Sequence, residues 1–303
     1  MGRLVTVALV TWNSAQWLQR CLDGIAHQTH RDFELIVADN ASSDESLSMI
    51  PPNVRVIRNA TNRGFSAAVN QILEIANGEF VQLVNPDAFL ERDYIERLLA
   101  AFRDPTIGSA TGKLLRLDGS IDSMGIRMTR SGRHFDIDRN PSREVFGASG
   151  AAAMHRMSFL RDVATYGEVF DEDFFAYRED ADIAWRGRLF GWRAVYVEEA
   201  VARHVRRVTP ERRRELPPEI NMHSVKNRFL LRMKNEGLYL AVRNAPFEIA
   251  RDLIVLGAAL TIERSSLPAF RWLWRNRARV LAKRAAIQKR RVISDRRLAR
   301  WFR

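Results

Sequence analysis

Short runs of β-branched and aliphatic residues alternate with helical patterns through the first third of the chain. The runs predict strands at residues 4–10, 33–38, 54–58 and 80–84. Amphipathic periodicity predicts helices at 15–27 and 66–76, and a further helix that ends at Phe102. Strands and helices that alternate in this way indicate βαβ units and a largely parallel sheet.

The pattern changes after residue 108. Glycines and weak periodicity at 108–150 predict irregular β structure that crosses over the sheet. Beyond Asp180 we expect a helix that ends at Gly191, a residue suited to a helix C-cap, followed by a last strand at 192–197. After His204 a basic segment that contains prolines leads into long helical patterns, where we expect no further strand.

Charge divides the chain at the same place. The 303 residues carry 48 Lys and Arg against 36 Asp and Glu, a formal charge of +12. Residues 1–200 have a net charge of −6, whereas residues 201–303 have a net charge of +18. A basic nucleic-acid-binding protein is one alternative, but the base-reading motifs of that class are missing and the front of the chain is acidic. We therefore expect an α/β domain at 1–240 that binds no nucleic acid, and a basic helical tail at 241–303.

Cysteine content and hydropathy point to a cytoplasmic protein. Cys21 is the one cysteine, which excludes an intramolecular disulfide and a site of several thiolates. The apolar run at 4–10 has no small-residue cleavage site after it. The longest apolar stretch of the tail, 253–262, is about half of the ~20 residues that span a bilayer, so we expect no transmembrane helix.

The tail also carries a pattern typical of a membrane-surface helix. Apolar side chains fall at helical spacing between Ala269 and Lys283. Basic residues follow four apart on another face: Arg271, Arg275, Arg279 and Lys283. We expect residues 245–303 to bind an anionic membrane surface. The alternative is a helical subdomain that packs on the sheet and leaves its basic face in water.

Polar turns follow three of the predicted strands, at the edge where the carboxyl ends of parallel strands meet. Their residues include Thr11, Trp12, Asn13, Asp39, Asn40, Asp44, Asn85 and Asp87. Each turn alone is explained by the preference of Asn, Asp and Ser for turns and helix caps. Three turns at one edge favour a ligand site. The Gly-rich turn of dinucleotide-binding folds and the P-loop are both absent from the sequence.

The chain resembles glycosyltransferase family two in a series of ordered motifs. The first four are VALVTWNSAQWLQRCLDGI, FELIVADNASSDES, NRGFSAAVNQI and FVQLVNPDAFL. Similarity resumes with FGASGAAAMHR, FDEDFFAYREDADIAWRGRLFGW and MHSVKNRFLLRMKN. The rhamnosyltransferase-type members look most similar. The resemblance implies the GT-A fold, a Rossmann-like α/β fold with a mostly parallel sheet, here with a basic helical extension.

The resemblance implies that the turns after the first two strands hold the base and ribose of a nucleotide-diphosphate sugar. Asp39 would accept a hydrogen bond from the imide N–H of uracil or thymine. A further segment would shape the same pocket, and Gly64 there permits close approach of the backbone to the ligand. Its residues are Asn62, Arg63, Gly64, Phe65 and Asn70. For Asn70, a buried helix amide is an equal alternative.

Asp87 takes the last position of the family's Asp-x-Asp metal motif, where a carboxylate suits Mg²⁺ or Mn²⁺. Asn85 replaces the first Asp, so strict dependence on a metal stays open. His204, just after the last predicted strand, matches a further ligand of many GT-A enzymes and would favour Mn²⁺. The alternative for His204 is a solvent-facing histidine in a basic loop.

The acids of residues 171–182 are interleaved with aromatic residues. Glu179, Asp180 and Asp182 match the family's Glu-Asp-x-Asp motif, which makes Asp180 the implied general base. A helix N-cap is the alternative role of Asp180. Asp182, with Trp185 and Arg186 one turn later, would face the acceptor.

One base without a paired acid predicts direct displacement with inversion, because a nucleoside diphosphate leaves readily once a cation neutralises it. The resemblance implies a hexosyltransferase that moves L-rhamnose from dTDP-rhamnose to a lipid-linked or polysaccharide acceptor in cell-envelope synthesis, at the inner face of the cytoplasmic membrane. UDP-galactose or UDP-glucose is the alternative donor. The processive Gln-x-x-Arg-Trp pattern is absent, which favours single additions.

Overall fold

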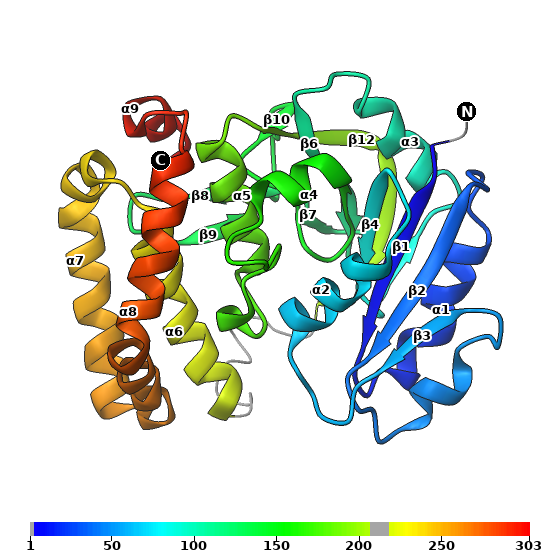
Figure 1. The fold of residues 1–303 in the computed structure, drawn as a ribbon, viewed down its shortest axis with the longest axis horizontal. Helices are drawn as coiled ribbons and strands as arrows, with labels where there is room; N and C mark the ends of the chain where they lie inside the picture. Colours follow the sequence, from blue (N-terminus) through cyan, green and yellow to red (C-terminus); the bar gives the residue numbers. More distant parts are fainter. Residues whose placement is uncertain (1–2, 207–217) are drawn as a thin grey trace.

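The computed structural model describes residues 3–206 and 218–303, and Figure 1 shows a large sheet with long C-terminal helices at one side. The main path of the sheet runs through β10 (Glu144–Val145), β12 (Arg193–His204), β6 (Ile107–Leu115), β11 (Ala153–Arg156), β4 (Phe80–Val84), β1 (Val5–Thr11), β2 (Phe33–Asp39) and β3 (Arg55–Arg58). Off this path, β5 (Ala88–Leu90) pairs with β12 and β7 (Ile121–Ser123) pairs with β6. A separate two-stranded sheet consists of β8 (Ile126–Met128) and β9 (His134–Asp136).

The parallel half of the sheet confirms the four predicted N-terminal strands. β1 pairs in parallel with β2 and β4, and β2 pairs in parallel with β3. All of β1 is buried, because its side chains alternate between two hydrophobic clusters. Val5 and Leu9 belong to one cluster, and Ala8 and Val10 belong to the other. Thr11 is the last residue of β1, so it lies at the carboxyl edge of the sheet while still buried.

Helices cover both faces of this sheet. The first cluster includes residues of α1 (Ala15–Ala26) and α3 (Tyr94–Ala101). The second cluster includes residues of α2 (Phe65–Ile75), α4 (Met157–Val163) and α5 (Glu179–Leu189). Short 3₁₀ turns, η1 (Glu45–Met49) and η2 (Glu172–Phe174), stand in the polar connections. The predicted helices at 15–27, 66–76 and after Asp180 are therefore confirmed.

The prediction of irregular crossing structure at 108–150 is wrong for its first part. β6 lies inside the sheet, antiparallel to β11 and parallel to β12. Its glycines are packing residues: a Cβ at Gly112 would lie 2.3 Å from the Ala200 carbonyl oxygen, and one at Gly108 2.6 Å from the Phe159 ring. Glycine that admits a close neighbour looks the same in a sequence as glycine that breaks a strand.

The last strand is longer than the predicted 192–197. β12 continues to His204, but its register with β6 shifts between Tyr196 and Val201. The exposed Glu198 and Glu199 lie in this irregular part and interrupt the hydrophobic pattern. The continuation pairs with β5, which brings His204 opposite Ala88.

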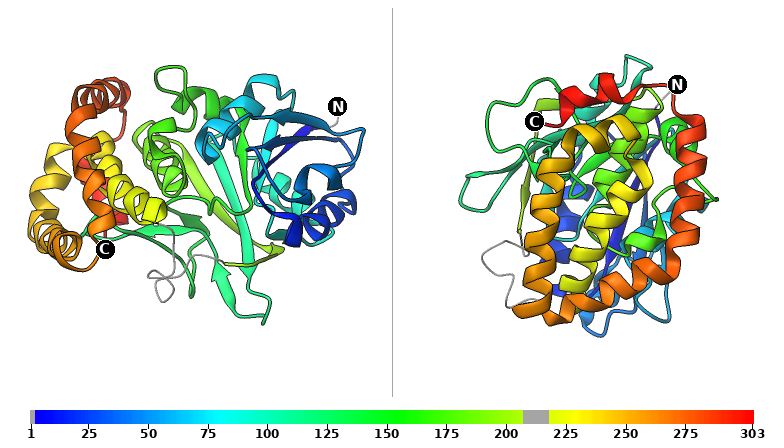
Figure 2. Two further views of the ribbon diagram at one scale, coloured as in Figure 1. Left: turned by 90° about the horizontal axis from the view of Figure 1, so that it is seen from below. Right: turned by 90° about the vertical axis from the view of Figure 1, so that its left-hand side faces the viewer.

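The C-terminal part is helical, as predicted. It contains α6 (Pro218–Asn235), α7 (Leu238–Thr261), η4 (Arg264–Ser266), α8 (Leu267–Arg290), α9 (Asp295–Leu298) and η5 (Ala299–Trp301). The long helices α6, α7 and α8 lie side by side (Figure 2). One hydrophobic cluster joins Trp185 of α5 to Leu230, Leu273 and Phe302. The core thus continues across the predicted domain boundary at residue 240.

The basic row predicted on α8 does not form one solvated or lipid-facing surface. Arg271 and Arg275 are exposed, but Lys283 is buried and donates to Asp171 at 2.7 Å. Arg279 contacts Asp173 at 2.5 Å. This part of α8 therefore packs on the protein and does not lie on a membrane surface, but it does not leave its basic face wholly in water. Among the described residues, no helix is both long enough and apolar enough to cross a membrane.

Candidate active site

The carboxyl ends of β1 and β2 present two buried oxygens without a partner. Asp39 is 3% exposed, and its Oδ2 accepts a hydrogen bond from Ser42 N at 3.1 Å. Within residues 3–206 and 218–303, neither its Oδ1 nor the Thr11 hydroxyl has a hydrogen-bond partner. A buried acceptor without a partner costs free energy unless a ligand supplies a donor. Asp39 Oδ1 therefore fits the role of accepting an N–H from a nucleobase.

The two polar turns next to these oxygens are tied to each other. Asn13, whose φ is +48°, accepts a hydrogen bond from Ser43 N at 2.8 Å and donates its own N–H to Ser42 Oγ at 3.0 Å. Asp44 accepts from Ala15 N and Ser46 N, both at 3.0 Å, so its carboxylate caps α1 and η1. The structure thus uses Asp44 as a cap, and leaves the side chain of Trp12 52% exposed at the surface.

The segment before α2 packs against the loop after η2. Gly64 has a φ of +85°, and a Cβ there would lie 2.6 Å from Phe175. Asn62 closes the turn by accepting from Gly64 N at 2.9 Å, and buried Asn40 donates to the Gly64 carbonyl at 3.1 Å. Two predicted pocket residues of this segment lie nearer the surface: Arg63 is exposed and Phe65 is half-buried.

Asn70 has its amide occupied by the protein. Its Nδ2 donates to the Phe170 carbonyl at 2.7 Å, and its Oδ1 accepts from Phe170 N at 2.9 Å. These bonds connect α2 to the chain that leads into η2. They support the buried-amide alternative for Asn70.

Asp87 and His204 are brought together by the pairing of β5 with β12. The distance from His204 Nε2 to Asp87 Oδ1 is 3.5 Å, and His204 Nδ1 lies 2.8 Å from Asp122 Oδ2. Burial lowers the pKa of His204, but the hydrogen bonds and charges of Asp122 and Asp87 outweigh burial and raise this pKa to about 9. His204 is thus not a solvent-facing loop residue.

These residues fit a divalent cation held partly by its substrate, and such a cation would replace the Nε2 proton that the raised pKa of His204 retains. A carboxylate behind the second ring nitrogen is the usual support of a metal-binding histidine, and Asp122 supplies it. The described residues contain no cluster of three or more His, Cys, Asp or Glu arranged for a metal. Asp87 and His204 would then be two protein ligands, and phosphate oxygens would complete the site, as they commonly do for Mg²⁺. The half-buried Asn85 side chain follows β4 beside them.

Asp180 lies at the start of α5, where its carboxylate accepts hydrogen bonds from two backbone N–H groups. Its Oδ1 accepts from Ala181 N at 2.7 Å and its Oδ2 from Gly150 N at 3.3 Å. Burial, together with the charge of Asp136, raises the pKa of Asp180 above its ordinary value. Burial and the charge of Asp180 raise the pKa of neighbouring Glu179 as well. A carboxylate with a raised pKa is a stronger base, as general-base catalysis requires.

The loop before Asp180 is strained and held by α6. Phe175, Tyr177 and Arg178 all have positive φ, between +66° and +73°. The buried amide of Asn227 donates to the carbonyl oxygens of Phe174, Ala176 and Tyr177 at 2.8–2.9 Å. Strain of this kind persists only where the surroundings enforce it. The C-terminal helices therefore help to set the position of Asp180.

The acceptor role predicted for Asp182, Trp185 and Arg186 does not fit their burial. None is more than 1% exposed, and Arg186 Nε donates to Asp182 Oδ2 at 2.9 Å. Lys234 Nζ and Asn235 Nδ2 donate to Asp182 Oδ1 at 3.0 and 2.7 Å. These side chains are buried in the core beside α5, and the one-turn spacing from Asp182 to Arg186 closes an ion pair there.

A chain of charged side chains connects the Asp87 side of the site to Asp180. Arg206 contacts Asp122 through Nε at 2.7 Å and Asp136 through Nη2 at 2.5 Å. Asp136 in turn acts on the pKa of Asp180. Sequence reasoning missed Asp122, Asp136 and Asn227. The first two lie in the stretch with weak periodicity, where nothing marks them, and Asn227 lies in a family-like motif to which no role was given.

Comparisons with known proteins agree with this architecture. The profile described as glycosyl transferase family 2 matches residues 6–164. The N-acetylglucosaminyl-diphospho-decaprenol L-rhamnosyltransferase of Mycobacterium tuberculosis is 31% identical over 242 residues, which cover 67% of this chain and 76% of that protein.

Two solved structures show the same fold. The mannosyltransferase PcManGT from Pyrobaculum calidifontis, in complex with GDP-Man and Mn²⁺, has a TM-score of 0.57 and 20% identity over 93% of this chain and 84% of its own. TarS from S. aureus in complex with UDP-GlcNAc has a TM-score of 0.58 and 17% identity over 94% and 90%. The chain belongs to glycosyl transferase family 2, and it is a glycosyltransferase with the GT-A fold.

Proposed function

We propose that this glycosyltransferase is inverting and non-processive, and that it moves L-rhamnose from dTDP-rhamnose to a lipid-linked acceptor of the cell envelope. The observation that carries the proposal is the Asp180 carboxylate, a single base with a raised pKa at the start of α5. The 31% identical rhamnosyltransferase, named for a diphospho-decaprenol acceptor, supports this donor and this kind of acceptor.

Asp180 removes the proton of the acceptor hydroxyl as the new glycosidic bond forms. Its Oδ2 has one weak backbone donor, Gly150 N, so it can turn to the acceptor without losing a strong bond. Gly150 also leaves little room at this place, since a Cβ there would lie 3.3 Å from Asp180 Cβ. The acceptor oxygen bonds to the anomeric carbon from one face while the bond from that carbon to the diphosphate oxygen breaks on the other face, so the sugar inverts its configuration.

The nucleotide lies across the ends of β1 and β2. Asp39 Oδ1 accepts a hydrogen bond from the imide N–H of thymine or uracil, a donor that cytosine lacks and that guanine carries in a purine ring. Thr11 lies beside it, and Asn40 and Asn62 fix the turn at Gly64. UDP-galactose and UDP-glucose satisfy the same base contact and are the alternative donors.

Asp87 and His204 hold a divalent cation, Mg²⁺ or Mn²⁺, at the diphosphate. When bound, this cation neutralises the charge that develops on the leaving nucleoside diphosphate. Asp122 keeps the His204 ring oriented with Nε2 towards Asp87. Two Mn²⁺ complexes among structures of the same fold support this use of a cation.

The test is a thermal-shift screen of the whole chain with dTDP-rhamnose, UDP-galactose, UDP-glucose and GDP-mannose, each with Mg²⁺ or Mn²⁺. We expect the largest increase in Tm with dTDP-rhamnose, because bound ligand stabilises the folded state in proportion to its affinity. A larger shift with a UDP-sugar would replace rhamnose as the donor. No shift with any donor would contradict the nucleotide site.

A further inference from the structure

Helix α7 exposes its apolar side chains and turns its charged side chains towards the protein. Its exposed side chains include Leu238, Val242, Ile249, Leu253, Ile254 and Leu260, each more than half exposed. Its four charged side chains face inward instead. Arg232 of α6 pairs there with Glu248 at 3.1 Å and with Asp252 at 2.5 Å. A surface helix ordinarily presents the opposite pattern, so the outer face of α7 is built for an apolar environment.

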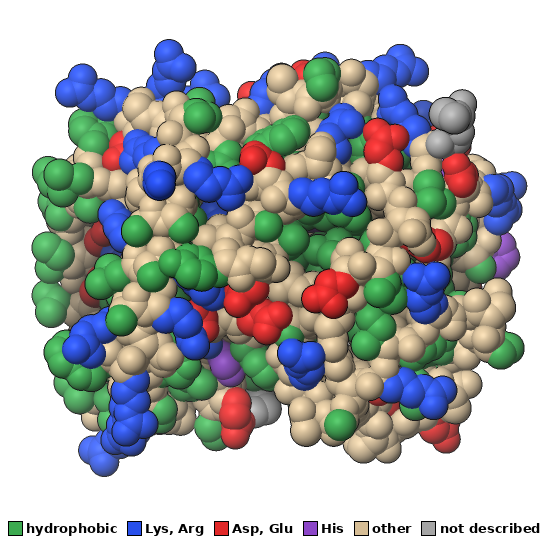
Figure 3. All heavy atoms as spheres, in the orientation of Figure 1, with side chains coloured by type: hydrophobic (Ala, Val, Ile, Leu, Met, Phe, Trp, Pro, Cys, Tyr) green, Lys and Arg blue, Asp and Glu red, His purple; other side chains and the backbone are tan. Residues whose placement is uncertain are grey.

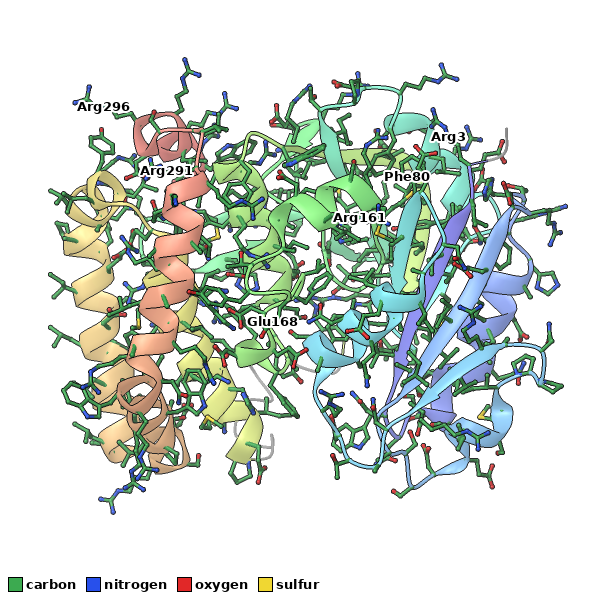
Figure 4. All side chains as sticks on the ribbon, in the orientation of Figure 1. Arg3, Phe80, Arg161, Glu168, Arg291 and Arg296 are labelled. Carbon is green, nitrogen blue, oxygen red and sulfur yellow. The ribbon has the colours of Figure 1, made fainter. Side chains whose placement is uncertain are left out.

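Both ends of this apolar face carry exposed arginines. Arg296 lies over the Tyr239 ring at the start of α7, and Arg264 donates to the Leu260 carbonyl at its end, at 3.4 Å. Figure 3 shows the apolar column along the left edge, with Lys and Arg above and below it, and Figure 4 labels Arg296 at the top. A second copy of the chain would bring arginine against arginine in either orientation. An anionic lipid surface complements both the apolar face and its ends.

A pocket opens beside this face, between α6 and α7. Its volume is about 180 Å³, and its lining includes Arg228, Arg251, Ser224, Ile254 and Glu263. Arg228 is 5% exposed, and its Nη1 has no hydrogen-bond partner, nor does Nε of Arg251. Ile254 belongs to both the pocket and the exposed face, so the two are continuous.

In the described part of the chain, the lining of the pocket has more positive than negative side chains, because Arg228 and Arg251 stand against Glu263 alone. Burial, and then the charges of Arg178, Arg251 and Arg133, lower the pKa of Arg228 to about 9. Arg232, one turn along α6, has two carboxylates as hydrogen-bonding partners, whereas the described residues give Arg228 none. A buried guanidinium among like charges is costly unless an anion joins it, and phosphate oxygens suit it best.

The position of this charge relates it to the catalytic base. Arg178 acts on Arg228 and immediately precedes Glu179 and Asp180. Arg178 does not line the pocket itself, so its charge would act on a bound anion from outside the pocket. We propose that the pocket between α6 and α7 holds the diphosphate of a polyprenyl-linked acceptor, whose hydrocarbon chain lies along the outer face of α7 at an anionic membrane surface. This inference rests on the lipid-linked acceptor of the proposed function.

The test is co-sedimentation of the full chain with three kinds of vesicle: phosphatidylcholine alone, with phosphatidylglycerol, or with a polyprenyl diphosphate. We expect polyprenyl diphosphate to strengthen binding more than an equal charge of phosphatidylglycerol does. Arg228→Gln should remove this extra binding, about tenfold in affinity, since it removes a charged donor to phosphate. Arg228→Lys should keep part of it. Arg275→Gln, an exposed arginine of α8, is the matched control and should leave the preference intact.

A second pair of variants tests the apolar face. Leu253→Asp should weaken binding to all three vesicles, whereas Leu117→Asp, also exposed but between β6 and β7, should not. Equal losses from Arg228→Gln and Arg275→Gln, or no preference for the diphosphate lipid over phosphatidylglycerol, would overturn the pocket. Equal binding of both Asp variants would overturn the role of α7. The thermal shift with the nucleotide-sugar donor separates the two proposals. Arg228→Gln should still show this shift, because Arg228 does not contact the donor. Absence of the shift in the unsubstituted chain contradicts the proposed function alone.

Discussion

Lys283 of α8 donates a hydrogen bond to Asp171, beside η2, at 2.7 Å, in the interior of the protein. The same lysine contacts Glu168 at 2.9 Å and Asp173 at 3.1 Å, and Lys234 of α6 also pairs with Asp171. Figure 4 labels Glu168 between the C-terminal helices and the sheet. The positive helices thus neutralise the acids that precede α5, and the basic tail is part of the fold.

Replacement of Lys283 by Met should destabilise the protein. It leaves buried carboxylates with fewer partners, so we expect a loss of about 3 kcal/mol in the free energy of unfolding. Lys289→Met, an exposed change on the same helix, should cost less than about 0.5 kcal/mol. Urea denaturation of both variants measures the difference. Equal midpoints would show that the buried pair contributes nothing.

Asp180→Asn should abolish transfer and keep donor binding. The amide has nearly the same shape but cannot take a proton, so the chemical step is lost while the nucleotide contacts remain. Single-turnover transfer and the donor thermal shift, measured on the same preparation, separate the two effects. Transfer at the unsubstituted rate would exclude Asp180 as the base.

The rate of transfer should depend on pH through Asp180. The base acts when it is deprotonated, so the rate falls as pH drops through its pKa. Burial and Asp136 raise that pKa, and the acidic limb should therefore lie above the value of about 3.9 of an ordinary aspartate. A profile of kcat against pH tests this, with Asp136→Asn expected to move the limb to lower pH. An unmoved limb would mean that Asp136 does not act on the base.

Asp122→Asn should weaken the binding of the cation. Asp122 acts through the His204 ring, and the loss of such a support commonly costs 10–100-fold in metal affinity, so we expect about tenfold or more. The Mn²⁺ concentration that gives half-maximal transfer measures it. Asp118→Asn, an exposed acid between β6 and β7, is the control and should leave this concentration unchanged. Full activity of the unsubstituted chain in EDTA would contradict the cation site.

Asp39→Asn should weaken binding of thymidine and uridine diphosphates. An amide at this place can turn a donor towards the imide N–H, so we expect a loss of about tenfold in affinity. Calorimetric titration with dTDP and UDP measures it. Asp44→Asn should instead lower Tm with little change in affinity, because Asp44 caps α1 and η1. The reverse pattern would exchange the roles of the two residues.

The parallel half of the fold could be read from the sequence because its strands are short, apolar and followed by polar turns. Asp39 and Asp87 could be singled out because each lies in a polar turn at the end of a predicted strand, whereas His204 and Asp180, and the roles of all four residues, were implied by the resemblance to the family. β6 was missed because Gly108 and Gly112 serve close packing, which no local pattern distinguishes from a break.

Contacts between distant segments could not be predicted. Lys283 and Asp171 are 112 residues apart, and charge spacing on α8 alone cannot show that one of its basic residues is buried. Trp185 and Arg186 were placed at an acceptor because helical spacing gives a face but not the direction in which that face points. For α7, periodicity cannot distinguish an apolar face that points outward from one that points inward.

β12 pairs with β6 on both sides of its shift of register, and after the shift it also pairs with β5. Val201 to Arg203 follow the shift and continue beside β6, while His204 lies opposite Ala88 of β5. Side chains alternate along a strand, so deletion of one residue at Glu198 or Glu199 would turn His204 to the opposite face and put the Val205 side chain in its place. The length of an exposed, acidic irregularity therefore determines whether the histidine side chain reaches Asp87 at all.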